Sequence, residues 1–291
     1  MEKHTPVLLH ESIHMLDLTP VDTVVDGTFG GGGHSALIAQ QLAPKGRLIC
    51  VDLDEAAQVR FEEQFQDKKN VTFVHANFKD VALILGQAAI TTVDKVLLDL
   101  GTSVFQLLSD TRGFSFQSDT PLTMTFSEKG SHTGFTAADI INTWQESSIA
   151  DIIYGYGEEK SSRKIARAIV AARTISPIIT AKQLAEVIEQ AVPRRGRIHP
   201  ATKTFQALRI TVNDELGTLT EAMNAWWQVI NPGGRLCIIT FHSLEDRPVK
   251  QWMKSQLNGR VITKKPITPS SEELQINPRS RSAKLRTIEK I

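Results

Sequence analysis

Residues 23–35 decide the fold, and they read Thr23-Val-Val-Asp-Gly-Thr-Phe-Gly-Gly-Gly-Gly-His-Ser35. Three β-branched residues followed by an acid predict a short buried strand over 23–26. The glycines predict a tight turn, and the apolar spacing of residues 35–42 predicts a helix after it. A strand, a glycine-rich turn and a helix in this order are typical of the first unit of a doubly wound α/β sheet.

The same alternation continues through the first hundred residues. Short apolar runs predict strands over 47–52, 71–74 and 93–99, and helical spacing predicts a helix over 56–65. The run 47–52 ends in an acid, as the first strand does. Strands that alternate with helices of this length predict right-handed βαβ units on a parallel sheet.

The alternation stops after residue 104. Up to residue 199 no stretch predicts a strand convincingly, and the segment contains a Gly/Ser/Thr-rich loop over 109–135 and several short helices. Three of these helices begin with the spacing of a capping box, in the pairs Thr136 and Asp139, Ser148 and Asp151, and Thr180 and Gln183.

The sheet resumes near the end of the chain. One long helix is predicted over 201–230, and a buried strand follows over 235–241. Trp226 and Trp227 both lie on this helix, so we expect at least one of them to be a core residue and not a base-stacking platform. We therefore predict an α/β fold with a Rossmann-like doubly wound sheet and an inserted all-helical domain. The predicted sheet domain comprises residues 1–104 and 206–291, and the predicted helical domain comprises residues 105–205.

Length and composition favour a soluble intracellular protein. The 291 residues are enough for two domains. The two cysteines, Cys50 and Cys237, lie in apolar runs, which predicts buried reduced thiols and neither a disulfide framework nor a metal site. No apolar stretch reaches the length of about 18 residues that a membrane span needs. We expect a cytoplasmic location and no membrane partner.

The formal net charge of +1 conceals a strong segregation of charge. Residues 1–100 carry 8 Lys and Arg against 14 Asp and Glu, whereas residues 160–209 carry 11 against 2 and residues 247–291 carry 11 against 3. Such segregation favours a basic face that meets a polyanion. The alternative is a pair of solvated helix faces and a loose tail, and charge alone does not separate the two.

The glycine turn predicts a nucleoside-containing cofactor. Asp52 follows it by about twenty residues at a strand end, where a carboxylate can hold both ribose hydroxyls. A dinucleotide site would need a third glycine where Ser35 stands. Asp26, directly before the glycines, instead suits S-adenosylmethionine, because the methionyl ammonium of that cofactor favours a nearby carboxylate.

Two further residues lie beside this predicted site. Phe78, after the third strand, can lie against the adenine ring, or it is a core aromatic under a loop. Asp99 ends the fourth strand, where a methyltransferase sheet faces the methyl group. We favour a cofactor contact for Asp99 over the role of a base that orients an acceptor amine and takes its proton. No residue is assigned as catalytic.

A compact basic loop predicts contact with RNA. It contains Arg194, Arg195 and Arg197, and a second basic surface is predicted on the helix that carries Arg163, Lys164, Arg167 and Arg173. A base must be unstacked for its amine to reach a donor, so a single-stranded or opened RNA is expected. The candidate substrate-binding residues are Arg194, Arg195, Arg197, His199, Lys203 and His242; for His242 a structural role is the alternative.

Eight ordered motifs resemble one family from end to end. The chain is similar to the bacterial ribosomal RNA small subunit methyltransferase H family, also called MraW. The motifs that carry the resemblance are Asp26-Gly-Thr-Phe-Gly-x-Gly-Gly-His-Ser35, Leu98-Asp-Leu-Gly101, Arg112-Gly-Phe-Ser-Phe116, Tyr156-Gly-Glu-Glu159, Lys164-Ile-Ala-Arg-Ala-Ile169, His199-Pro-Ala-Thr-Lys-Thr-Phe-Gln-Ala-Leu-Arg209, Phe241-His-Ser-Leu-Glu-Asp-Arg247 and Asn277-Pro-Arg-Ser-Arg281.

The resemblance implies a function and a site. It implies methylation of the N4 amine of a decoding-centre cytidine in 16S rRNA of the small ribosomal subunit, with S-adenosylmethionine as donor. The sequence does not determine the oligomeric state and leaves a homodimer open. Carried over position by position, it implies cofactor contacts at Gly32, Gly33, His34, Asp52, Phe78, Asp99 and Gln106.

Two stretches depart from the family pattern. Residues 103–108 read Ser-Val-Phe-Gln-Leu-Leu where Ser-Ser-Pro-Gln-Leu-Asp is usual, and the loop 119–127 carries Thr123, Thr125 and Ser127 in place of two acids and an arginine. This loop motivates two alternatives, a non-catalytic ribosome-assembly or RNA-binding factor that keeps the cofactor fold, and a methyltransferase with another RNA or a protein as target.

Overall fold

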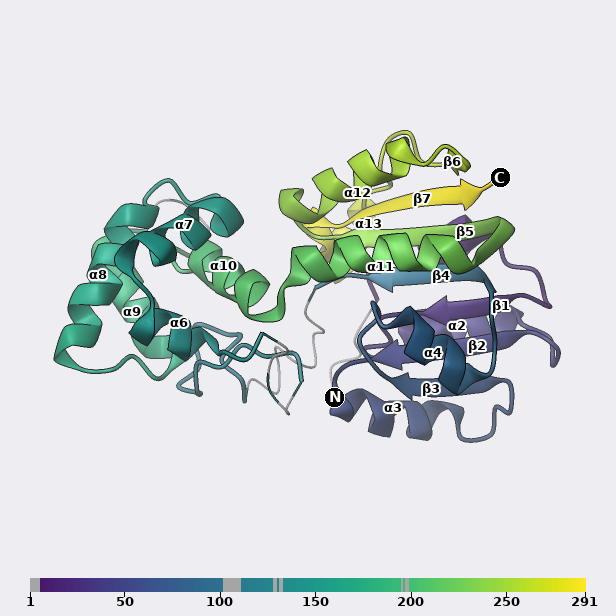
Figure 1. The fold of residues 1–291 in the computed structure, drawn as a ribbon, viewed down its shortest axis with the longest axis horizontal. Coiled ribbons are helices and arrows are strands. Elements are labelled where there is room, and N and C mark those ends of the chain that lie inside the picture. Colours follow the sequence, from purple (N-terminus) through teal and green to yellow (C-terminus); the bar gives the residue numbers. More distant parts are fainter. Residues whose placement is uncertain (1–5, 102–110, 128–129, 131–132, 195, 197–198) are drawn as a thin grey trace. The chain divides into compact units, whose positions relative to one another are not determined.

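The computed structural model describes residues 6–101, 111–127, 130, 133–194, 196 and 199–291. The chain forms two compact units (Figure 1). Unit 1 comprises Met1–Ser103 and Gly217–Ile291, and unit 2 comprises Val104–Leu216. Unit 1 contains two hydrophobic cores and unit 2 contains one.

Unit 1 is built on a seven-stranded sheet in the order β3-β2-β1-β4-β5-β7-β6. Strands β1 to β5 pair parallel with one another, whereas β7 pairs antiparallel with both β5 and β6. The strands are β1 (Thr23–Asp26), β2 (Arg47–Asp52), β3 (Val71–His75), β4 (Val93–Asp99), β5 (Ile230–Thr240), β6 (Gly259–Val261) and β7 (Lys284–Lys290).

The order of the strands reverses beside β1. From β1 the chain runs outward through β2 to β3, then returns to β4 on the other side of β1. Such a reversal opens a crevice at the carboxyl ends of the two central strands, which is where doubly wound sheets bind their ligands. The glycine turn that follows β1 therefore stands at the switch point of the sheet.

Both faces of the sheet are covered, because alternate strand residues point to opposite sides. On one face Ile49, Leu98 and Ile238 pack with buried residues of α4, α11 and α12. On the other face Leu48 and Cys237 pack with residues of α1, α2 and α3. The helices of unit 1 are α1 (Leu9–Leu16), α2 (Gly33–Gln41), α3 (Glu55–Phe65), α4 (Val81–Ala88), α11 (Glu215–Val229), α12 (Ser243–Ser255), α13 (Ser271–Ile276) and the 3₁₀ helix η1 (Pro278–Ser282).

Unit 2 is helical in its described residues, apart from one isolated bridge between Pro121 and Thr180. Its core gathers Ile140, Ile153 and Ile188, all buried, from three different helices. The helices are α6 (Ala137–Thr143), α7 (Glu146–Gly157), α8 (Ser162–Ile175), α9 (Ala181–Ala191) and α10 (Thr202–Asn213).

The structure corrects three details of the sequence prediction. The helix predicted over 201–230 is two helices, because Asp214 adopts a left-handed conformation with φ 45° and ends α10. The strand predicted over 235–241 begins earlier, at Ile230. The segment that reads as a possible loose tail instead supplies β7 to the sheet, so the sheet is mixed and not wholly parallel.

Helix starts in unit 2 follow the predicted caps in two cases out of three. Thr136 and Thr180 each form a complete capping box. The box predicted at Ser148 is wrong, because the N-cap residue of α7 is Gln145, three residues earlier. Among the described residues, no helix has both the length and the apolar character that a membrane crossing requires.

Candidate active site

The glycine turn lies across the ends of two strands. Gly27 N donates to Leu97 O on β4, and Phe29 N donates to Val51 O on β2. Gly32 has φ +77°, and a Cβ atom there would stand 2.7 Å from the Phe29 ring, so a side chain meets both strain and a clash. The turn therefore brings free backbone N–H groups to the switch point, at the start of α2.

Asp26 shapes this turn from within. Its carboxylate accepts from Ser35 Oγ at 2.6 Å and from Thr28 N at 3.2 Å, and the residue is buried. Burial raises the pKa of Asp26 to about 6, against the lowering effect of these two hydrogen bonds. Asp26 therefore holds the turn with both oxygens. Its contact with a cofactor ammonium stays a prediction.

Asp52 ends β2 and closes the other side of the turn. Its Oδ2 accepts from Gly30 N at 2.7 Å and its Oδ1 accepts from Asp54 N at 2.9 Å. Burial is the main cause that raises the pKa of Asp52 to about 6. The side chain stays half-buried, and a carboxylate offers about four acceptor positions. Asp52 therefore keeps capacity for two hydroxyl donors.

Asp99 ends β4 beside His34. Asp99 Oδ1 is buried and has no hydrogen-bond partner among the described residues, and Oδ2 lies 3.9 Å from His34 Nδ1. The pKa of Asp99 is raised well above its usual value, mainly by burial and further by the charges of Asp26 and Glu245. Leaving a buried acceptor unsatisfied is costly, so a ligand donor or cation is the natural complement of Oδ1.

His34 is held in one orientation at the start of α2. Its Nε2 lies 3.1 Å from the carbonyl oxygen of Val7, and the ring is buried. Burial lowers the pKa of His34 to about 4, so the imidazole is neutral at physiological pH. A neutral ring that donates from Nε2 to Val7 O leaves Nδ1 as an acceptor, and that atom faces Asp99.

Phe78 stands over the start of the turn. A Cβ atom on Gly27 would lie 3.3 Å from Phe78 Cβ, and the Phe78 carbonyl accepts from Trp226 Nε1 at 2.8 Å. Its ring is half-buried and packs against the core. Phe78 is therefore anchored in the core with part of its ring accessible, and its contact with an adenine ring stays a prediction.

The structure brings most of the predicted cofactor residues to one edge of the sheet. They follow β1, end β2 and β4, or follow β3, so all of them stand at the carboxyl ends of parallel strands. These residues are Gly32, Gly33, His34, Asp52, Phe78 and Asp99. Gln106 lies outside the described residues.

This donor and acceptor set fits S-adenosylmethionine. Asp52 has acceptor capacity for ribose hydroxyls, the half-buried Phe78 ring offers an apolar face, and the orphaned Asp99 Oδ1 complements a donor or a positive charge. The glycine turn leaves room for backbone approach. The same crevice has no third glycine in the position that a pyrophosphate site needs.

His242 follows β5 at the same edge of the sheet. Its Nε2 lies 3.1 Å from Glu245 Oε1, although neither ring nitrogen makes a hydrogen bond of good geometry within the described part of the chain. Glu245 is buried, and its Oε2 accepts from the backbone N–H of Phe241 at 2.7 Å and of His242 at 3.3 Å. His242 is thus placed by a buried acid at the start of α12.

The candidate substrate residues of unit 2 have structural partners. His199 stacks on Phe116 with ring centroids 4.2 Å apart, and its Nε2 lies 2.7 Å from Glu189 Oε1. Lys203 Nζ donates to the Glu158 carbonyl at 2.9 Å. Arg194 is exposed just after α9. Arg195 and Arg197 lie outside the described residues.

The predicted basic surface on α8 is only partly available. Arg173 donates to the carbonyl oxygens of Ile141 and Trp144, both at 2.6 Å, so its guanidinium secures backbone. Arg163 and Lys164 are exposed. The charge pattern alone could not distinguish these roles, because all three residues occur on one helix.

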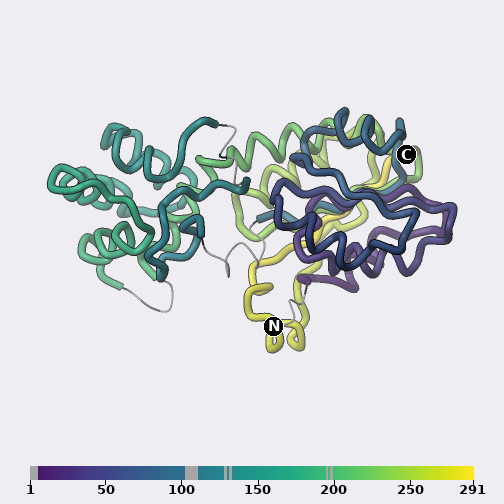
Figure 2. Tube along the Cα trace, turned by 90° about the horizontal axis from the view of Figure 1, so that it is seen from below, coloured from purple at the N-terminus to yellow at the C-terminus, as the bar shows by residue number. Residues whose placement is uncertain are grey.

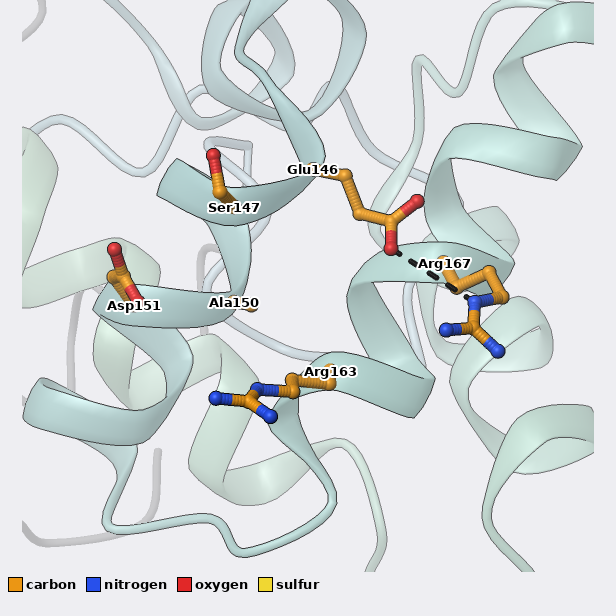
Figure 3. A pocket seen from close by; sticks show the side chains of 6 residues that line it. All are labelled: Glu146, Ser147, Ala150, Asp151, Arg163 and Arg167. Carbon is orange, nitrogen blue, oxygen red and sulfur yellow. Dashed lines mark ion pairs between the residues drawn. The ribbon is translucent and has the colours of Figure 1, made fainter.

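A pocket of about 500 Å³ opens between α7 and α8 (Figure 3). Both signs of charge line it, and Arg167 Nε lies 3.8 Å from Glu146 Oε1. Its lining residues are Glu146, Ser147, Ala150, Asp151, Arg163 and Arg167. The two acids balance the two arginines, so this pocket has no net attraction for a polyanion.

A family model described as the MraW methylase family matches residues 1–291. The chain belongs to the MraW methylase family. It is a methyltransferase of the class whose donor is S-adenosylmethionine, and the crevice described above fits that donor.

Named relatives match this methylase over nearly their whole length. The "Ribosomal RNA small subunit methyltransferase H" of Deinococcus deserti is 46% identical over 289 residues, which cover 99% of this chain and 93% of the relative. The protein of that name from Desulfotalea psychrophila is 46% identical over 292 residues, 99% of this chain and 98% of its own. A solved rRNA methylase from Streptococcus thermophilus aligns over 99% of this chain and 98% of its own, with 11% identity and a TM-score of 0.47.

Sequence reasoning missed several residues that shape the crevice of this methylase. Thr28 Oγ1 accepts from Asp99 N at 2.6 Å, and Arg60 Nε donates to Gly30 O at 2.9 Å. Glu245 and Val7 position His242 and His34. Thr28 lies inside the glycine motif and Glu245 follows His242 by three residues, so both were open to inference. Arg60 and Val7 contact the site only through the tertiary fold.

Proposed function

We propose that this methylase transfers a methyl group from S-adenosylmethionine to the N4 amine of a decoding-centre cytidine in 16S rRNA. The observation that carries the proposal is the family match over residues 1–291, together with relatives named for the small-subunit ribosomal RNA at 46% identity. The eight ordered motifs of the chain support the same substrate. A cytoplasmic site of action and the small ribosomal subunit as partner follow from this proposal.

We infer cofactor roles for the residues at the carboxyl edge. S-adenosylmethionine, when bound, supplies a methyl group on a positively charged sulfur, and that charge disappears as the methyl group leaves. In this proposal Asp52 holds the ribose hydroxyls, Phe78 covers the adenine, and Asp99 with His34 lines the methionyl side of the crevice. The absence of side chains at Gly32 and Gly33 lets the cofactor come close to the backbone. Gln106 is a further cofactor contact, which the family resemblance implies.

The acceptor amine needs little more than positioning. An exocyclic amine conjugated to its base is a weak nucleophile, so alignment with the methyl group and exclusion of water supply most of the rate. Asp99 ends β4 at the carboxyl edge, and its pKa is raised well above its usual value, mainly by burial. In this proposal Asp99 contacts the cofactor, and no residue is assigned as the base. Candidate contacts to the RNA are Arg194, Arg195, Arg197, Lys203 and His242, with His199 as a residue that holds the loop through its own partners.

The loop over 119–127 supports a second candidate, a methyltransferase with a changed target. Thr125 and Ser127 are buried, and Thr123 Oγ1 donates to Arg112 O at 3.1 Å. The hydroxyls that replace the usual acids and arginine thus face the interior of unit 2 in part. Hydroxyl groups that are buried or bonded within unit 2 are not available to contact a nucleotide. The loop therefore offers fewer polar contacts to the acceptor, and this favours a different target.

One experiment tests both candidates. Purified protein is incubated with labelled S-adenosylmethionine and unmethylated small ribosomal subunits, and the RNA is digested and analysed by mass spectrometry. We expect N4-methylcytidine from the decoding centre. Label in a different nucleoside or position would support the changed target. Intact cofactor binding without label in any RNA would contradict both and favour a non-catalytic assembly factor.

A further inference from the structure

The motif Asn277-Pro-Arg-Ser-Arg281 has no role in the cofactor crevice. It forms η1, directly before β7. Because β7 is antiparallel to β5, its first residue pairs with the last residue of β5, in the register Thr240 with Lys284. The turn therefore stands at the same edge of the sheet where β1, β2, β4 and β5 end, which is the edge that carries the crevice.

The backbone of this turn is firmly anchored. Ser280 is 0% exposed and its Oγ donates to the Asn277 carbonyl at 2.8 Å. Ala283 N donates to Ser280 O at 2.8 Å, and Ala283 is buried in the core between the sheet and α1 to α3. A buried residue between two arginines holds their Cα positions, so little backbone entropy is lost when a ligand binds them.

The two arginines of the turn are exposed and unengaged. Neither Arg279 nor Arg281 makes an ion pair or a hydrogen bond with any residue in the part of the chain that the structure describes. The other arginines near β7 are paired: Arg286 binds Asp246, and Arg235 and Arg260 bind Glu289. The paired arginines therefore have a structural role in unit 1, whereas no contact of this kind explains Arg279 and Arg281.

A short chain of contacts ties the neighbouring helix to the crevice. Leu8 N donates to Glu273 Oε1 of α13 at 2.9 Å, and the preceding residue, Val7, bonds His34. Figure 2 draws this C-terminal segment of unit 1 in yellow. The segment that carries the arginines is thus fastened to the residues that hold the cofactor side of the site.

We propose that Arg279 and Arg281 form a binding site for backbone phosphates of the RNA strand whose base enters the crevice. The inference rests on the proposed function and deepens it, because it adds a phosphate contact on unit 1 to the candidates of unit 2. Guanidinium groups bind phosphate oxygens in pairs and position a strand without reading its sequence. A strand held at this edge has its phosphates anchored beside the place where one base must be turned out of the stack.

The test compares two double variants with equal changes of charge. Arg279→Ala/Arg281→Ala removes the proposed site. Lys68→Ala/Lys69→Ala removes two exposed cations directly before β3, at the opposite, amino edge of the sheet. Binding of a single-stranded RNA that contains the target cytidine is followed by fluorescence anisotropy as the salt concentration varies, and methyl transfer to unmethylated small subunits gives KM and kcat.

We expect the arginine variant to lower the salt slope of RNA binding by about 1.4, because each neutralised phosphate of a single strand contributes about 0.7. Its KM for RNA rises about tenfold, as expected for two exposed ionic contacts, while kcat and the Kd for S-adenosylmethionine stay unchanged. Arg279→Lys/Arg281→Lys keeps the charges and restores most of the slope. The lysine variant at the amino edge behaves as the wild type.

The outcomes separate the two proposals. Equal effects of both alanine variants would show a general loss of charge and overturn the phosphate site, as would a wild-type slope in the arginine variant. If the wild type methylates the subunit and the arginine variant matches it in slope and KM, only this inference fails. If the wild type binds the cofactor but neither binds nor methylates RNA, the proposed function fails and this inference falls with it.

Discussion

At the scale of single residues, three carboxylates crowd the carboxyl edge of the sheet. Asp26 and Asp52 have pKa values raised to about 6, in each case mainly by burial, and the pKa of Asp99 is raised further by the charge of Asp26. Ionisation of all three buried carboxyl groups is unfavourable in the free protein. A bound cation or strong hydrogen-bond donors would stabilise their charged forms. The edge is therefore electrostatically prepared for a positively charged ligand.

The affinity for S-adenosylmethionine should depend on pH around 6. Hydroxyl donors bind the ionised form of Asp52 best, so a carboxyl with a pKa of about 6 must lose its proton when the ligand binds below that pH. Affinity should then be constant above about pH 7 and fall by up to about tenfold per pH unit below 6 for each linked group. Isothermal titration calorimetry in buffers of different ionisation enthalpy measures both the affinity and the proton release.

Asp52→Asn is the matched variant for this prediction. It keeps one oxygen acceptor and removes the charge, so affinity at pH 7.5 should fall at least about tenfold, and the dependence near pH 6 should weaken. Asp67→Asn, a change at an exposed carboxylate after α3, serves as the control. Wild-type affinity and pH dependence in Asp52→Asn would contradict the role assigned to this residue.

Local sequence revealed part of this site and hid the rest. The glycine turn and the position of Asp52 at a strand end were predictable, because they lie in or just beyond one strand–turn–helix unit. Gly32 and His34 were named by the family resemblance, and their cofactor contacts stay predictions. The inward bonds of Asp26 were not predictable, because they depend on Ser35 turning back toward the strand end. The effect of the Glu245 charge on Asp99 was also hidden, since the start of α12 comes near Asp99 only when β5 pairs with β4.

At the scale of elements, the glycine turn is shaped by what packs against it. The ring of Phe29 is buried and meets Phe61, Phe65 and Phe73 at centroid distances of 5.8, 6.1 and 5.8 Å. The Phe29 ring cannot move aside without losing its packing contacts with the other three rings. The turn therefore needs glycine at position 32 for space as well as for its positive φ.

Gly32→Ala should destabilise unit 1 and weaken cofactor binding. The added Cβ meets the Phe29 ring at 2.7 Å in a left-handed conformation, which together cost about 2 kcal/mol or more. Gly86→Ala is the control, because this glycine lies in α4 with nothing within 4 Å of the added Cβ. That change should stabilise the protein by up to about 1 kcal/mol. Thermal unfolding with and without cofactor measures both; equal stability of the two variants would refute the packing argument.

Helix caps in unit 2 provide a second test at this scale. Thr136 accepts from Asp139 N at 3.2 Å and completes a capping box, so Thr136→Ala should cost about 1 kcal/mol of stability. Ser148 stands inside α7, where alanine is the better helix former, so Ser148→Ala should be neutral or slightly stabilising. Urea unfolding distinguishes them. A larger loss of stability from Ser148→Ala than from Thr136→Ala would contradict this assignment and support an N-cap at Ser148.

At the scale of the whole molecule, the chain forms three hydrophobic cores, two in unit 1 and one in unit 2. The core of unit 2 is formed by its own helices and by loop residues such as Leu122 and Met124. The two cores of unit 1 lie on opposite faces of one sheet. Separate cores allow separate unfolding transitions, and a ligand raises only the transition of the unit that binds it.

Ile188→Ala should therefore act on one transition only. Ile188 is 0% exposed in α9, and its truncation should destabilise unit 2 by about 2–5 kcal/mol. The Kd for S-adenosylmethionine should not change, because the proposed cofactor residues that the structure describes belong to unit 1. Differential scanning calorimetry resolves the transitions as cofactor is added. A cofactor-dependent shift of the transition weakened by Ile188→Ala would mean that the units unfold together.

By itself, the sequence determined the strand–helix alternation, the glycine turn, the acid at the end of β2 and the helical insertion, because these depend on local spacing and backbone conformation. Only the tertiary structure decided the break at Asp214, the entry of β7 into the sheet and the edge at which Arg279 and Arg281 stand. Strand order and direction arise from contacts between residues far apart in the chain. A local sequence pattern does not specify which strands become neighbours. The set of residues that meet at the carboxyl edge of the sheet is therefore known only from the folded molecule.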